Sequence, residues 1–142
     1  MNKQTITVDF DDTLQTVFSE LSDNRVEFFR LLAQVSTVYI VTARHAEHVG
    51  EIRQFLKEQN IQVCGIISDC RSKVNACKSL NSLAHFDDSE RHCKELTENG
   101  VNCYYMGEFH SETMKQVWKR SKVEQGVWKY YVLDNNTRGL SE

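Results

Sequence analysis

The chain has 142 residues, 17 of them basic and 20 acidic, and a formal net charge of −3. A chain of this length can bury one hydrophobic core without disulfides or a structural metal, so we expect a single domain spanning residues 1–142. The near balance of charge argues against a protein that coats nucleic acid and against a polyacidic tail.

The cysteines and the N-terminal segment indicate a cytoplasmic protein. There are five cysteines, an odd number without a C-x-x-C pair, so we expect reduced thiols. The first residues, MNKQTITVDF, lack the apolar stretch of about 7–15 residues that a secretory signal needs. No run comes near the ~18 apolar residues of a membrane helix, so we expect no membrane-spanning segment.

Short β-branched runs alternate with longer amphipathic segments along the chain. Ser89 is expected as the N-cap of the last helix in the alternating region and Asn99 with Gly100 as its C-cap. The alternation predicts parallel strands joined by right-handed crossovers, hence a three-layer, Rossmann-like α/β sandwich with a five-stranded parallel sheet. The predicted strands are 5–10, 36–41, 62–67, 82–86 and 101–106, and the predicted helices are 25–34, 45–59, 72–80 and 89–99.

The stretch ITVDFDDTL places Asp9, Asp11 and Asp12 at the end of the first strand. Carboxylates a few ångströms apart oppose each other's ionisation, so this crowding costs stability unless a cation, a shared proton or a chemical role offsets it. In parallel sheets ligands bind beyond the carboxyl ends of the strands, near the point where strand order reverses. The polar residues at the other strand ends are therefore expected to share a site with these acids.

Four further residues lie where this site is expected. Thr42 ends the second strand, Asp87 and Asp88 end the fourth, and Lys73 opens the helix between the third and fourth strands. Oxygen ligands hold Mg²⁺, while a lysine and a metal ion together neutralise a phosphoryl group. The pattern therefore predicts Mg²⁺ as cofactor and a phosphorylated substrate.

The DFDDT motif, followed by a strand-terminal threonine, a lysine and a strand-terminal acid pair, resembles the haloacid dehalogenase-like (HAD) superfamily of phosphohydrolases over residues 5 to about 106. The resemblance implies that Asp9 is a nucleophile that forms an aspartyl-phosphate. It implies that Asp11 protonates the leaving group, later activates water, and binds the metal through its backbone carbonyl.

The same resemblance assigns the remaining strand-end residues. Thr42 and Lys73 correspond to the phosphoryl-binding threonine and lysine, and Asp87 with Asp88 to the acids that complete the Mg²⁺ site. Lys78 is a rival for the lysine role, but Lys73 is favoured because it opens the helix nearest the strand ends, whereas Lys78 lies deep in that helix. We also expect Arg44, directly after the second strand, to bind substrate, with a solvated helix start as the alternative for Arg44 and His45.

Two departures from the family pattern bear on the substrate. Asp12 stands where glycine often sits, which puts metal affinity in doubt rather than the reaction class. Only 28 residues separate Asp12 from Val41 and 30 separate Thr42 from Lys73, so neither gap holds a cap domain. A site without a cap domain is open to solvent and favours a bulky substrate, such as a nucleic-acid end or a phosphoprotein.

Two other metal sites are weaker readings of the same sequence. A calcium loop that starts at Asp9 would need glycine at its sixth position, where Leu14 stands. A zinc site from His85, His92 and Cys93 lacks a second clustered pair of ligands, so we expect these residues in the core or at the surface.

Residues 107–142 extend beyond the resemblance. We expect a helix there with Lys115, Lys119 and Lys122 on one face, which is either a solvated face or a stripe that tracks nucleic-acid phosphates. The run 127–133 is expected as an extra edge strand that could mediate homo-oligomerisation.

These observations predict a Mg²⁺-dependent phosphomonoester hydrolase that acts through Asp9. We rank a nucleotide or polynucleotide phosphate end first among substrates. The alternatives are a phosphoprotein or small-metabolite phosphatase, and a phospholigand-binding module with little turnover.

Overall fold

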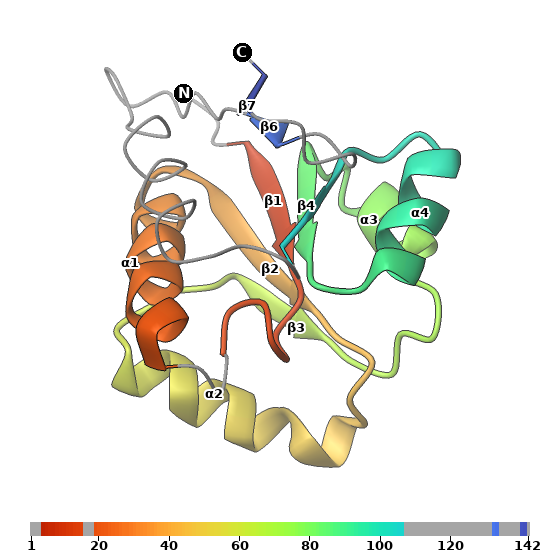
Figure 1. Cartoon of the computed structure of the whole chain (residues 1–142). Coiled ribbons are helices and arrows are strands. Elements are labelled where there is room, and N and C mark those ends of the chain that lie inside the picture. The colour runs from red at the N-terminus through yellow and green to blue at the C-terminus, as the bar shows by residue number, and fades with distance from the viewer. Residues whose placement is uncertain (1–3, 16–18, 107–131, 134–139, 142) are drawn as a thin grey trace.

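The computed structural model describes residues 4–15, 19–106, 132–133 and 140–141, and its main feature is a five-stranded, all-parallel sheet with helices (Figure 1). The sheet order is β3-β2-β1-β4-β5. The prediction of an α/β fold with a five-stranded parallel sheet is confirmed. The strands are β1 (Thr5–Val8), β2 (Thr37–Val41), β3 (Gly65–Ile67), β4 (Ala84–Asp87) and β5 (Cys103–Tyr105).

One helical segment follows each of the first four strands, as the alternating pattern predicts. The first helix begins at Ser19, before the predicted start at residue 25. The segment predicted over 45–59 starts as a 3₁₀ turn, η1 (Ala46–His48). The α-helices are α1 (Ser19–Val35), α2 (Val49–Glu58), α3 (Val74–Ser79) and α4 (Glu90–Glu98).

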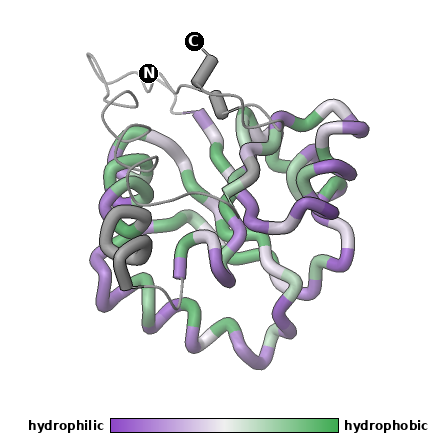
Figure 2. The backbone as a smooth tube through the Cα atoms, in the orientation of Figure 1, coloured by the Kyte–Doolittle hydropathy of each residue, from purple (hydrophilic) through white to green (hydrophobic). Residues whose placement is uncertain are grey.

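Alternation along the central strands separates two buried layers. Ile6 and Val8 of β1 point to one face of the sheet and pack in the same core cluster as Leu32 of α1 and Ile52 of α2. On the opposite face, Cys77 of α3 packs with α4 and β5. Figure 2 shows hydrophobic stretches along the strands and hydrophilic ones along the outer turns of the helices.

An aromatic cluster joins α1 to the centre of the sheet. The ring of Phe86 on β4 lies 5.7 Å from Phe28, 5.5 Å from Phe29 and 5.1 Å from Tyr104, measured between ring centroids. All four side chains are buried. Edge-to-face ring pairs of this kind add to the free energy that burial alone provides.

Both predicted caps of α4 are confirmed. The Ser89 side chain accepts a hydrogen bond from the backbone N–H of His92. At the other end Gly100 adopts φ +82°, and the N–H groups of Gly100 and Val101 donate to the carbonyls of Thr97 and Leu96. This Schellman pattern needs a left-handed residue, which glycine supplies without steric cost.

The order of the sheet reverses between β1 and β4. From β1 the chain continues to β2 and β3 on one side, whereas β4 and β5 lie on the other side. Strands β1 and β4 are hydrogen-bonded neighbours, with Thr7 opposite His85 and Val8 opposite Phe86. The carboxyl ends of β1 and β4 therefore form the edge where a ligand is expected in such folds.

The predicted C-terminal elements fall mostly outside the described residues. This applies to the basic helix with its row of lysines and to residues 127–131 of the extra strand. The described part of that strand, β6 (Val132–Leu133), pairs antiparallel with β7 (Leu140–Ser141) in a separate two-stranded sheet. No helix within the described ranges combines the length and apolar character that crossing a membrane requires.

Replacing Phe29 by alanine is expected to lower the free energy of unfolding by about 3–5 kcal/mol, because it removes a buried ring from the aromatic cluster and leaves a cavity. Urea unfolding measures the change. The exposed residue Gln54 of α2 provides the control, since Gln54→Ala should change the same quantity by less than about 0.5 kcal/mol. Equal effects of the two substitutions would contradict this account of the core.

Candidate functional site

Asp9 and Asp87 lie side by side because β1 and β4 are paired in parallel register. The pairing of Val8 with Phe86 continues into a hydrogen bond from the Asp9 N–H to the Phe86 carbonyl, 2.9 Å long. Asp87 is the last residue of β4, so the two acids follow each other across the end of the ladder. Both side chains are buried.

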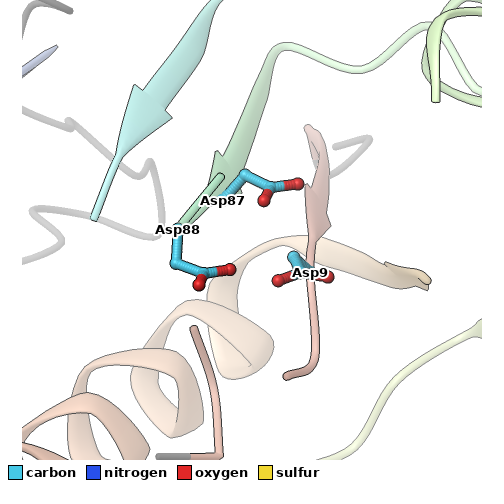
Figure 3. A group of neighbouring side chains, drawn as sticks. All are labelled: Asp9, Asp87 and Asp88. Atoms are coloured by element: carbon cyan, nitrogen blue, oxygen red, sulfur yellow. The ribbon is translucent and has the colours of Figure 1, made fainter. Parts of the chain in front are cut away.

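Asp88 and Thr13 complete the acidic end of the site. Carboxylate oxygens of Asp9, Asp87 and Asp88 lie within 4.8 Å of one another, and Figure 3 shows the three side chains gathered between the ends of β1 and β4. The buried hydroxyl of Thr13 lies 3.0 Å from Asp9 Oδ2 and 3.3 Å from Asp88 Oδ1. The loop after β1 thus brings the Thr13 hydroxyl into contact with Asp9 and Asp88.

Lys73 is the buried cation of this group. Its ammonium donates hydrogen bonds to Asp9 Oδ1 at 2.9 Å and to Asp87 Oδ2 at 2.7 Å. The side chain reaches the acids from the residue directly before α3, and only 1% of Lys73 is exposed. Lys78, the rival lysine, is exposed on α3. The contacts made here therefore belong to Lys73.

Burial has opposite outcomes for the two carboxyl groups that Lys73 contacts. Burial raises the pKa of Asp9 well above its ordinary value of 3.8, and the charge of Asp87 raises it further against the opposing effect of Lys73. Burial also acts to raise the pKa of Asp87, but the hydrogen bond from His85 and the charge of Lys73 outweigh it and lower that pKa to about 2. Asp87 is thus ionised at neutral pH. The repulsion between the two carboxyl groups therefore acts mainly against ionisation of Asp9.

The lysine itself stays charged. Burial acts to lower the pKa of Lys73, but the charges of Asp9 and Asp87 exceed that effect and raise it above 10.5. If all three carboxyl groups were ionised, the one ammonium would leave two negative charges uncompensated at this end of the sheet. A divalent cation would neutralise them and lower the pKa of Asp9, and the all-oxygen donor set suits a hard ion such as Mg²⁺.

Asp11 faces a different partner. The Arg44 guanidinium donates hydrogen bonds to the Asp11 carboxylate, from Nε at 2.9 Å and from Nη2 at 2.7 Å. Its Nη1 donates a third hydrogen bond to the Glu51 carboxylate at 3.0 Å. The hydrogen bond that Arg44 donates to Asp11 also raises the pKa of Arg44. The carboxylate of Asp11 therefore pairs with Arg44 and is not part of the three-acid group, and the predicted metal contact through its backbone carbonyl stays a prediction.

Thr42 and Asp12 lie in the loops that surround the acids. Thr42 is fully buried after β2, where its hydroxyl oxygen accepts a hydrogen bond of 3.1 Å from the Arg44 N–H. A hydroxyl that accepts still carries one hydrogen to donate. Asp12 adopts φ +60°, the left-handed region, which glycine adopts without steric cost and which aspartate tolerates better than most residues.

Two residues of the site went unrecognised in the sequence. Thr13 is part of the DFDDT motif, so its position in that motif was the available signal. His85 was expected to be a core or surface residue, and it is buried, but its Nε2 lies 2.8 Å from Asp87 Oδ2. The spacing of two along β4 places both side chains on one face, which is the signal that was present in the sequence. His92 and Cys93 are buried on α4, as expected.

No family model, curated protein or solved structure matches this chain. The chemistry of the site therefore rests on its geometry.

Asp9→Asn is expected to raise the free energy of unfolding of the metal-free protein at pH 7, because the amide carries no charge for burial and Asp87 to oppose. The raised pKa of Asp9 means that the folded protein keeps a proton which the unfolded chain loses above about pH 4. The free energy of unfolding of the wild type should therefore fall as pH rises from 4 through that raised pKa, and this fall should be absent in Asp9→Asn. Urea unfolding in the presence of a chelator measures both curves.

Asp12→Asn is the matched control, because Asp12 is an exposed acid in the same loop. It should follow the wild-type curve. Parallel pH curves for Asp9→Asn and the wild type would show that Asp9 is not the strained acid.

Proposed function

We propose that this chain is a Mg²⁺-dependent phosphomonoester hydrolase that acts through a phospho-aspartyl intermediate on Asp9. The observation that carries the proposal is the contact of Lys73 with Asp9 and Asp87 beside Asp88, at the point where the sheet order reverses. A phosphoryl group needs positive charge and an in-line nucleophile, and this corner offers an ammonium, a carboxylate and a set of cation ligands. In this proposal the fold is a capless, three-layer, Rossmann-like domain similar to the HAD superfamily.

In this proposal Asp9 is the nucleophile. Lys73 holds Oδ1 of its carboxylate and Thr13 lies against Oδ2, so the group cannot rotate freely. Attack forms a bond between an Asp9 oxygen and phosphorus and breaks the bond from phosphorus to the ester oxygen, which leaves with the electron pair. Water then displaces phosphate from Asp9. When bound, Mg²⁺ supplies positive charge that ionises Asp9 and draws electron density from the phosphoryl oxygens.

Asp11 is the proposed proton donor to the departing oxygen. A carboxyl group can donate only from an oxygen that is free to carry a proton, and both Asp11 oxygens accept hydrogen bonds from Arg44. Arg44 therefore has to leave Asp11 before the ester bond breaks, and oxygens of the substrate are competing acceptors for its forked N–H groups. This exchange gives Arg44 the predicted role in substrate binding, with Thr42 and Lys73 as the other contacts to the phosphoryl group.

The pairing of Arg44 with Asp11 also favours a second function. A protein that binds a phosphorylated ligand without hydrolysing it has no need of a protonated Asp11, and in this structure Asp11 is held in an ion pair. Such a module would use the same cation and Lys73 to bind the phosphate. Measured turnover separates the two functions.

The wild type is expected to hydrolyse p-nitrophenyl phosphate only with Mg²⁺, and Asp9→Asn to lower kcat by roughly 10³-fold or more, because an amide is a poor nucleophile. Release of p-nitrophenolate measures the rate. A wild-type rate at background with phosphate binding intact would favour the binding module, and equal rates in the two proteins would remove Asp9 as nucleophile.

Two controls in this experiment separate the site from its surroundings. Asp12→Asn makes the same chemical change three residues away and should keep most of the activity. Lys73→Met should abolish activity, whereas Lys78→Met, on the exposed side of α3, should not.

For the substrate we propose a nucleotide or polynucleotide phosphate end, with phosphoproteins and small metabolites as alternatives. In a phosphate-release screen, 3′- or 5′-phosphorylated oligonucleotides are expected to be the best substrates, with turnover that falls steeply as salt rises, because phosphate contacts release counterions. Salt-insensitive turnover of a free sugar phosphate, or preferred turnover of a phosphopeptide, would contradict this choice.

A further inference from the structure

His85 is a buried polar residue with a partner at each ring nitrogen. It lies on β4 two residues before Asp87, and no part of it is exposed. Nδ1 lies 2.9 Å from the Thr7 hydroxyl on β1, and Nε2 lies 2.8 Å from Asp87 Oδ2. The ring therefore spans the two central strands, directly behind the acids.

The chemistry of the two partners determines the direction of both hydrogen bonds. An ionised carboxylate only accepts, so Nε2 carries the hydrogen that is donated to Asp87. In the neutral ring Nδ1 then has a lone pair and accepts from the Thr7 hydroxyl. Thr7 thereby selects the tautomer in which His85 donates to Asp87.

Asp87 receives donors from three parts of the fold. Its Oδ2 accepts from His85 and from Lys73, whose ammonium lies 2.7 Å away, and its Oδ1 accepts from the Ser89 N–H at 3.0 Å. These donors oppose rotation of the carboxylate about its terminal bond. Without His85, one of the two donors to Oδ2 is lost and a buried charge is left with fewer partners.

We propose that His85 is a positioning residue that holds Asp87 in the orientation in which it both shares Lys73 with Asp9 and binds a divalent cation. His85 acts through Asp87 and touches neither substrate nor cation. The proposal rests on the proposed function for the identity of the site. It extends that function by assigning a role to a residue behind the acids, since partners of metal-binding side chains are often as important as the ligands themselves.

Two amide substitutions separate the two contacts of the ring. The amide of glutamine can place an N–H near the position of Nε2 and retain the donor to Asp87. The shorter amide of asparagine reaches only the region of Nδ1, near Thr7. Both remove the aromatic ring and both bury an amide, so they resemble each other in everything except the contact with Asp87.

The experiment is Mn²⁺ binding to the full chain, followed by electron paramagnetic resonance, with Mg²⁺-dependent hydrolysis of p-nitrophenyl phosphate as a second readout. His85→Asn is expected to weaken Mn²⁺ binding by about 10- to 100-fold. It should raise the Mg²⁺ concentration at half-maximal rate by a similar factor, with little change in the KM for the ester at saturating Mg²⁺. His85→Gln should restore most of the affinity.

Leu96→Ala is the stability control, because it removes buried packing on α4 without a contact to the acids, and its Mn²⁺ affinity should equal that of the wild type. If His85→Asn does not fold, Thr7→Val takes its place, with an expected loss of affinity of about two- to fivefold. Equal Mn²⁺ affinity of the Asn and Gln variants, or an unchanged affinity in Thr7→Val, would overturn the role of His85 and leave the proposed function intact. A wild type that binds no Mn²⁺ would overturn both.

Discussion

The ammonium of Lys73, buried between the carboxylates of Asp9 and Asp87, is the interaction on which the arrangement of the site depends. A buried ion pair is stable only when its geometry is good and its remaining atoms have partners. Here the partners come from separate elements, namely β1, β4 and the start of α3. The charges therefore tie the carboxyl end of the sheet to one helix, and loss of the Lys73 ammonium would leave two buried carboxyl groups without their shared cation.

The repulsion that remains between the carboxyl groups opposes the stability of the folded protein. Burial and the charge of Asp87 raise the pKa of Asp9, whereas hydrogen bonds from His85 and Lys73 keep Asp87 ionised despite its burial. Neighbouring acids with pKa values pushed in opposite directions are typical of functional sites. A bound cation would relieve the repulsion, so the folded protein stores in Asp9 a strain that ligand binding can release.

The Arg44–Asp11 pair adds a second constraint at the same edge. Two N–H groups of the Arg44 guanidinium bind the carboxylate of Asp11, the residue to which the resemblance assigns proton transfer. Asp11 and Asp9 are two residues apart, yet one side chain faces an arginine and the other a lysine with a second carboxylate. Their different surroundings, rather than their shared motif, give the two side chains different partners. In the proposed function, a substrate that binds the Arg44 guanidinium would also free Asp11.

Local pattern by itself determined the five strands, the caps of α4 and the gathering of acids at one edge, because parallel strands joined by helices bring their carboxyl ends together. It also located Asp9, Asp87 and Asp88 correctly near each other. Only the tertiary structure decided that Lys73 rather than Lys78 meets the acids, that Asp11 turns to Arg44, and that His85 supports Asp87. These outcomes follow from the register of β1 against β4 and from where α3 begins relative to the sheet. Both depend on packing between residues far apart in the chain, which no local pattern encodes.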